Sequence, residues 1–107
     1  MGCENHNKVI YPEDPKFQEL ESGFLIKKED AVKIYDKAFY DAFHIKKDSN
    51  FYKYQNLVVY TRNKSYYIGY ATVLDKRGNR NPHLAYVMNI SANTGELVKK
   101  IKYEKPN

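Results

Sequence analysis

The stretch EDAVKIYDKAFYDAFHI, residues 29–45, decides the class of fold because its apolar residues recur at helical spacing. One half of the expected helix is apolar, with small alanines at its centre, and the other half is charged or polar. Glu29 and Asp30 lie in the expected first turn, where carboxylates suit the helix dipole. The pattern predicts a long amphipathic helix that packs closely onto a sheet.

After this helix the apolar period changes to two, which is typical of strands. We expect four strands, at residues 54–61, 65–75, 83–91 and 96–104. Their connections are short, so neighbouring strands must run antiparallel. The second strand has apolar residues on both faces, and Gly69 lies at its middle, where glycine often marks a bulge or bend. We therefore predict an α+β fold, with one main N-terminal helix packed on a curved four-stranded antiparallel meander.

A chain of 107 residues is long enough for one domain. We expect residues 24–107 to form a single α+β domain. Residues 1–23 are expected to be a flexible tail or tether, with a short helix after Pro15 that Gly23 ends. The sequence contains no run of about 18 apolar residues, the length that a membrane-spanning helix requires.

The net charge of +5 comes from the C-terminal part of the chain. Residues 76–105 carry seven lysines and arginines against two acids, Glu96 and Glu104. Two interpretations stay open. The lysines can keep sheet edges soluble, or they can form a basic surface that meets an acidic partner or an anionic surface.

Residues that carry catalysis or bind metals are scarce in this sequence. His6, His44 and His83 lack metal-ligand spacing, and the sequence has neither a nucleophile elbow nor a glycine-rich phosphate loop. The single cysteine rules out an internal disulfide and Cys-rich zinc sites. We expect a protein that is not an enzyme, with no catalytic residue, metal or other cofactor.

Nucleic-acid binding is a further function to consider, because the chain has eleven tyrosines and a basic C-terminal third. The segment IGYATV, residues 68–73, partly resembles the strand octamer of RNA-recognition motifs. It departs from that octamer at Ile68 and Thr72. Tyrosines that alternate along strands are more often core residues and cross-strand pairs, so we expect no nucleic-acid partner.

Three segments together resemble the bacterial immunity proteins with the nuclear-transport-factor-two-like fold. FLIKKEDAVKIYDKAF, residues 24–39, is similar to their opening helix, and SYYIGYATV, residues 65–73, to their central strand. AYVMNISANTGELVKKI, residues 85–101, is similar to their closing hairpin. The alanine-rich helix and the terminal hairpin also resemble PepSY domains. The fold is therefore expected to be cystatin-like or nuclear-transport-factor-two-like.

The resemblance to immunity proteins implies a non-catalytic binding protein, an immunity or inhibitor protein that binds and neutralises a partner toxin. The candidate contact residues are Tyr66 and Tyr70 on the sheet and Arg77 and Arg80 on a loop tip. The basic charge disfavours a nuclease as the target, because an inhibitor of a basic cleft is expected to be acidic. The alternative is a small PepSY-like lipoprotein module of the cell envelope with an unknown ligand. The oligomeric state stays open.

The opening residues MGCENHNK, residues 1–8, bear on where the protein acts. We favour the interpretation that Cys3 is the lipid anchor of a bacterial envelope lipoprotein, in which Met1 and Gly2 replace a signal peptide. Eukaryotic-style acylation prefers Ser or Thr at position six, where this chain has His6. An incidental thiol in a cytoplasmic protein is the alternative. Membrane contact is expected only through Cys3.

Overall fold

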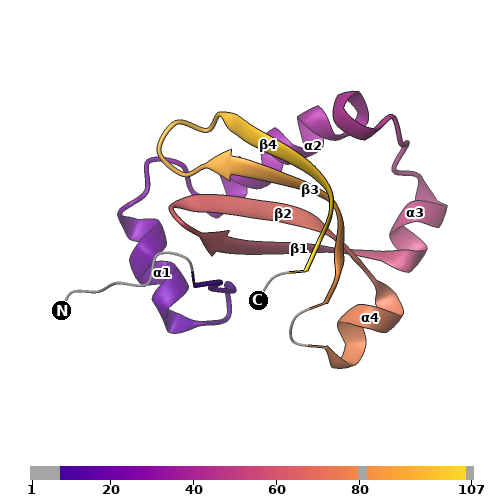
Figure 1. Cartoon of the computed structure of the whole chain (residues 1–107), viewed down its shortest axis with the longest axis horizontal. Coiled ribbons are helices and arrows are strands. Elements are labelled where there is room, and N and C mark those ends of the chain that lie inside the picture. Colours follow the sequence, from indigo (N-terminus) through magenta and orange to yellow (C-terminus); the bar gives the residue numbers. More distant parts are fainter. Residues whose placement is uncertain (1–7, 80–81, 106–107) are drawn as a thin grey trace.

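The computed structural model describes residues 8–79 and 82–105. Its four strands form one antiparallel sheet in the order β1-β2-β3-β4 (Figure 1). The elements along the chain are α1 (Pro15–Ser22), α2 (Lys28–Phe43), α3 (Ser49–Tyr54), β1 (Gln55–Arg62), β2 (Ser65–Thr72), α4 (Val73–Gly78), β3 (Leu84–Ser91) and β4 (Leu97–Glu104). The predicted α+β class, with its main helix before a four-stranded meander, is confirmed. The cystatin-like or nuclear-transport-factor-two-like assignment stays a prediction.

Helix α2 covers one face of the sheet, as its amphipathic pattern predicts (Figure 1). The helix ends where His44 adopts the left-handed conformation, with φ of 58°. Its buried side chains pack on residues of β2 and β3. This first cluster includes Ala31, Tyr35, Phe39, Tyr66, Ile68, Tyr70, Met88 and Ile90.

The opposite face of the sheet, which we call the second face, carries a second apolar cluster. It is formed by Val58, Tyr60, Tyr67, Ala71, Leu84 and Val87. The rings of Tyr60 and Tyr67 stack with centroids 5.0 Å apart. The Tyr60 hydroxyl donates a hydrogen bond to Glu104, so β1 and β4, the two outer strands, meet over this face. Such a contact requires the sheet to bend toward the second face, because three strand spacings of about 4.8 Å separate these strands.

A bulge lies next to Gly69, as predicted, but its extra residue is on β3, because Ile68 pairs with Met88 and Tyr70 pairs with Ala85. A Cβ at position 69 would lie 2.8 Å from Val87 Cγ2 and 3.0 Å from the Ala85 carbonyl oxygen. Glycine therefore allows β3 to approach β2 more closely than a side chain would permit.

The predicted second strand is too long, because β2 ends at Thr72 and residues 73–75 begin α4. The Thr72 hydroxyl accepts a hydrogen bond from the Asp75 N–H at 3.0 Å and caps the new helix. Leu74, which falls within the predicted strand of residues 65–75, is 78% exposed. Helix α3 was not predicted either. It begins where the Asp48 carboxylate accepts from the Phe51 N–H at 3.0 Å.

The N-terminal segment contains the predicted short helix, α1, which ends at Gly23. The described part of this segment also packs against the sheet. Ile10 exchanges two backbone hydrogen bonds with Thr61, of 3.0 and 2.9 Å, and Ile10 and Phe17 belong to the first cluster. Residues 8–23 are therefore part of the packed domain and not a tail. The sequence pattern did not indicate this, because the few apolar side chains that reach the core do not recur at a helix or strand period.

Candidate functional site

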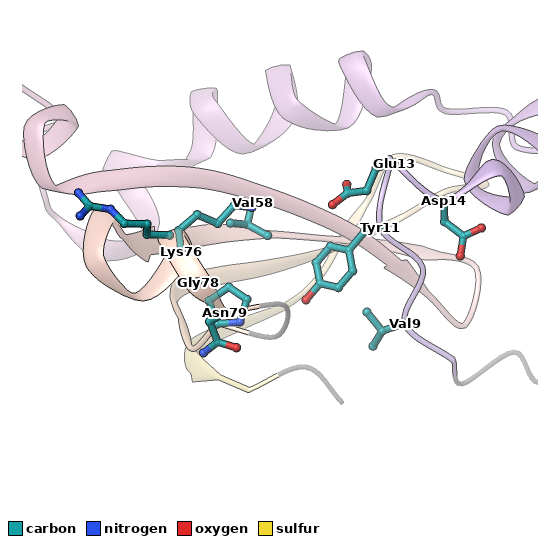
Figure 2. Close-up of a pocket in the computed structure, with 10 residues that line it drawn as sticks. Val9, Tyr11, Glu13, Asp14, Val58, Lys76, Gly78 and Asn79 are labelled. Atoms are coloured by element: carbon teal, nitrogen blue, oxygen red, sulfur yellow. The ribbon is translucent and has the colours of Figure 1, made fainter.

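A cavity of about 670 Å³ lies over the second face of the sheet, between the N-terminal segment and α4 (Figure 2). We call this cavity the β1 hollow. Val58 forms its floor, and the two walls come from segments about 65 positions apart in the sequence. The lining residues are Val9, Tyr11, Glu13, Asp14, Val58, Lys76, Arg77, Gly78, Asn79 and Pro82.

The N-terminal wall is held by its own backbone hydrogen bonds. The bridge from Ile10 to Thr61 fixes the segment on β1, and a turn follows in which the Asp14 N–H donates to the Tyr11 carbonyl at 3.0 Å. The Asp14 carboxylate then caps α1 by accepting from the Lys16 N–H at 2.9 Å. The turn leaves Glu13 exposed at the rim of the β1 hollow.

The α4 wall depends on Asp75. One oxygen of its carboxylate accepts from the Asn79 side-chain amide at 3.1 Å, and the other accepts from the His83 N–H at 2.8 Å. These bonds tie the end of α4 to the residues just before β3. They thereby position Asn79 and the buried Pro82 against the β1 hollow.

The two walls carry opposite charges. Glu13 and Asp14 stand on the N-terminal wall, and Lys76 and Arg77 on the α4 wall. Figure 2 shows the Tyr11 ring between these walls, with Val58 on the side of the ring that faces Lys76. Among the described residues the buried Tyr11 hydroxyl has no hydrogen-bond partner, and burial, with Glu13 and Glu104 nearby, raises its pKa. The β1 hollow thus has a tyrosine ring between an acidic and a basic wall.

Tyr66 and Tyr70, two of the predicted contact residues, are core residues. They are 0% and 3% exposed, and they lie on the face of β2 that α2 covers. The Tyr66 hydroxyl donates to the Ile26 carbonyl at 2.9 Å, and the Tyr70 hydroxyl accepts from Lys47 Nζ at 3.2 Å. Neither can be an exposed anchor for a partner, because α2 covers the face of β2 from which both side chains project.

Arg77, the third predicted contact residue, is exposed and lines the β1 hollow, although it lies on α4 and not on a loop tip. Arg80 and Cys3 lie outside the described residues, so their predicted roles stay predictions. Sequence reasoning missed Tyr11 and Glu13. The apolar triplet Val9–Tyr11 next to Pro12 was the available signal that this segment packs on the sheet.

A half-buried lysine, Lys47, forms a separate cluster next to α2. Lys47 Nζ lies 2.6 Å from the Asp36 carboxylate and 4.7 Å from the centre of the Phe39 ring. Burial alone would lower the pKa of Lys47, but hydrogen bonds to Asp36 and Tyr70 raise it above its ordinary value. The cluster is filled by the chain's own ammonium group, so it ties the segment after α2 to the core.

The pair Glu104 and Arg62 forms a third polar cluster, with Arg62 Nη2 3.1 Å from the Glu104 carboxylate. Burial raises the pKa of Glu104. Its carboxylate also accepts from the Tyr60 hydroxyl. With both oxygens engaged by β1 side chains, Glu104 links the two outer strands and is not presented to a substrate.

The comparisons with known proteins are negative: no protein-family model, curated protein or solved structure matches this chain. Within residues 8–79 and 82–105, no three His, Cys, Asp or Glu side chains gather as metal ligands would. The helices of that same part of the chain are all too short or too polar to cross a membrane. The fold and the site together define an α+β protein with an open, oppositely charged hollow beside an outer strand.

Proposed function

We propose that this chain is a non-catalytic binding protein whose partner is another protein, recognised at the β1 hollow. Following the resemblance to immunity proteins, we propose that the partner is a toxin and that binding neutralises it. The observation that carries the proposal is the make-up of the β1 hollow. It combines an aromatic side chain, an apolar floor and a charged rim that includes an arginine. Protein-binding surfaces combine the same features.

The exposure of the lining residues favours a macromolecular partner over a small molecule. Pockets for small ligands are enclosed and mostly apolar. In the β1 hollow, Glu13, Lys76, Arg77 and Asn79 are all exposed. Their long side chains surround the cavity and do not close it, so a protruding segment of a partner can enter while the rim contacts the surface around it.

The charge of the chain favours a partner with an acidic surface. The net charge is +5, and Lys76 and Arg77 are two of the basic groups. Exposed charges of this kind accelerate association and make it depend on salt, and they contribute less to the affinity itself.

The test is a protection assay in bacteria. The toxin encoded beside the gene in its native genome is expressed with and without this chain, and growth is measured. We expect the chain to restore growth. A variant with Lys76→Glu and Arg77→Glu should associate about tenfold more slowly, since rim charges act mainly on the association rate. The matched control, Lys99→Glu with Lys100→Glu on β4, changes the net charge equally.

The control variant should protect as well as the natural chain does. Equal association rates of the two charge-reversed variants with the toxin would remove the β1 hollow from the interface. Failure of the natural chain to bind any neighbouring gene product in calorimetry would overturn the neutralising role itself.

A further inference from the structure

The outer edge of β1 has backbone groups that face away from the sheet. β1 pairs with β2 on one side, and the Thr61 N–H and C=O turn to the other side to bond Ile10. Because backbone direction alternates along a strand, Val59 and Leu57 turn their N–H and C=O groups the same way. Within residues 8–79 and 82–105, Ile10 alone is paired with this edge. The edge opposite Leu57 and Val59 is therefore open.

Pro12 explains why the N-terminal segment does not cover the rest of this edge. Ile10 runs antiparallel to β1, so the following residues would continue along the edge toward Val59. Proline has no N–H to donate to a strand ladder. The turn closed by the Asp14 N–H and the Tyr11 carbonyl then carries the chain away from β1.

A groove of about 260 Å³ follows this open stretch and adjoins the β1 hollow; we call it the edge groove. Leu57, 39% exposed, Val59 and Val32 of α2 give it an apolar side. Its full lining is Tyr11, Pro12, Glu13, Lys28, Val32, Leu57, Val58, Val59 and Lys76. An extended chain laid here would bury apolar surface and meet unpaired backbone groups together.

The two outer strands differ in how they are protected against strand addition. β4 carries exposed lysines at 99, 100 and 102, and lysines on an edge discourage pairing with another chain. Residues 55–60 of β1, QNLVVY, contain no charged side chain. Only the β1 edge therefore has the character of a site for an added strand.

We propose that a short extended segment of the partner protein adds to β1 opposite Leu57 and Val59. A side chain of that segment on the Val58 side of the sheet would be acidic and would face Lys76. A side chain on the α2 side would be apolar and would face Val32, which lies one helical turn after Lys28. This inference rests on the proposed function, since it takes the partner to be a protein. Neither lysine ammonium forms an ion pair with a carboxylate in the described part of the chain.

A second copy of this chain fits the edge groove less well than such a segment. The β1 sequence QNLVVYTR has no acidic residue to offer to Lys28 and Lys76. In antiparallel pairing, Ile10 of the second copy would also occupy the edge where the first copy continues toward Gln55.

The test uses a defined peptide and the full chain labelled with ¹⁵N. The probe is the capped hexapeptide Val-Glu-Val-Glu-Val-Glu, which alternates apolar and acidic side chains. On titration we expect saturable NMR shifts at residues 55–60, with slowed hydrogen exchange at the Leu57 and Val59 amides. The same peptide with alternate N-methyl groups keeps its side chains but loses backbone donors, so its affinity should fall at least about tenfold, or 1.4 kcal/mol.

Charge is tested by a matched pair of variants. Lys76→Glu should weaken hexapeptide binding about tenfold, because the variant places a carboxylate against the acidic side chains. Lys102→Glu on β4 makes the same change of net charge and should leave the affinity within about twofold, because it lies at the other edge of the sheet. Equal effects of the two variants would overturn the proposed contact at Lys76.

Three further results would overturn strand addition at β1. They are shifts confined to β4, equal affinity for the N-methylated peptide, and protection of Leu57 and Val59 in a dimer without peptide. The last result would assign the edge to a second copy. If the toxin binds through Lys76 and Arg77 while the Leu57 and Val59 amides exchange freely in the complex, the proposed function survives and strand addition fails. If the hexapeptide adds to β1 but no toxin binds, strand addition survives and the proposed function fails.

Discussion

Replacing Gly69 with alanine tests the close packing of β2 on β3, which shapes the second face of the sheet. The new methyl group would lie 2.8 Å from Val87 Cγ2 and 3.0 Å from the Ala85 carbonyl oxygen, where ordinary contacts are 3.4–4 Å. The Val87 side chain can rotate, but the carbonyl oxygen moves only if β3 moves. Overpacking of this kind costs about 1–3 kcal/mol. The lower entropy of the unfolded alanine chain offsets about 0.4–1 kcal/mol.

The expected net effect is a loss of about 1–2 kcal/mol in the free energy of unfolding. For a domain of this size each kcal/mol corresponds to about 4–8 °C in Tm. Urea unfolding followed by far-ultraviolet circular dichroism measures the change. Gly78→Ala is the matched control, because no atom lies within 4 Å of a Cβ built there. Equal stability of the two variants would refute the close approach of β3 to Gly69.

The remaining predictions concern one half-buried cation, one buried phenol and the α4 wall. Lys47→Met should lower the free energy of unfolding by about 1–2 kcal/mol, since it removes the ion pair with Asp36 and the aromatic contacts. In the same urea experiment, Lys46→Met at an exposed position should change the free energy of unfolding by less than about 0.5 kcal/mol. Burial raises the pKa of Tyr35, so the folded chain keeps a proton that the unfolded chain loses above pH 10.0. Above pH 10.0 the free energy of unfolding of the natural chain should therefore fall with pH more steeply than that of Tyr35→Phe, by up to about 1.4 kcal/mol per pH unit. Equal pH dependence of the two chains would contradict this. Asp75→Ala should release the two hydrogen bonds that hold the α4 wall and shift the NMR signals of the β1 hollow, while a spectrum unchanged beyond the mutated site would mean that Asp75 does not position that wall.

The elements with a strong apolar period could be predicted from the sequence. Helix α2 was predicted because its wide apolar face matches the helical period, and an irregularity was expected at Gly69 because a glycine stood alone in an apolar strand. Helix α4 was missed because Val73 and Leu74 continue the strand alternation of β2. The Thr72 hydroxyl, which accepts a hydrogen bond from the Asp75 N–H, caps the helix that begins there instead.

The candidate site was harder to predict than the fold. Alternation along β2 shows that Tyr66 and Tyr70 share a face, but it does not show whether another element covers that face. The β1 hollow joins Tyr11 to Lys76, and no local pattern indicates a contact over that separation in the sequence. Ile10 fixes the N-terminal wall through a single bridge, and one residue produces no period.

The most direct test of partner binding at the β1 hollow is hydrogen–deuterium exchange of the full chain, alone and in complex with the toxin encoded beside its gene. We predict slower exchange in the complex at residues 11–14, 55–60 and 76–79, with β4 unchanged. Slower exchange confined to β4 and its lysines would contradict this account and place the interface on the opposite edge of the sheet.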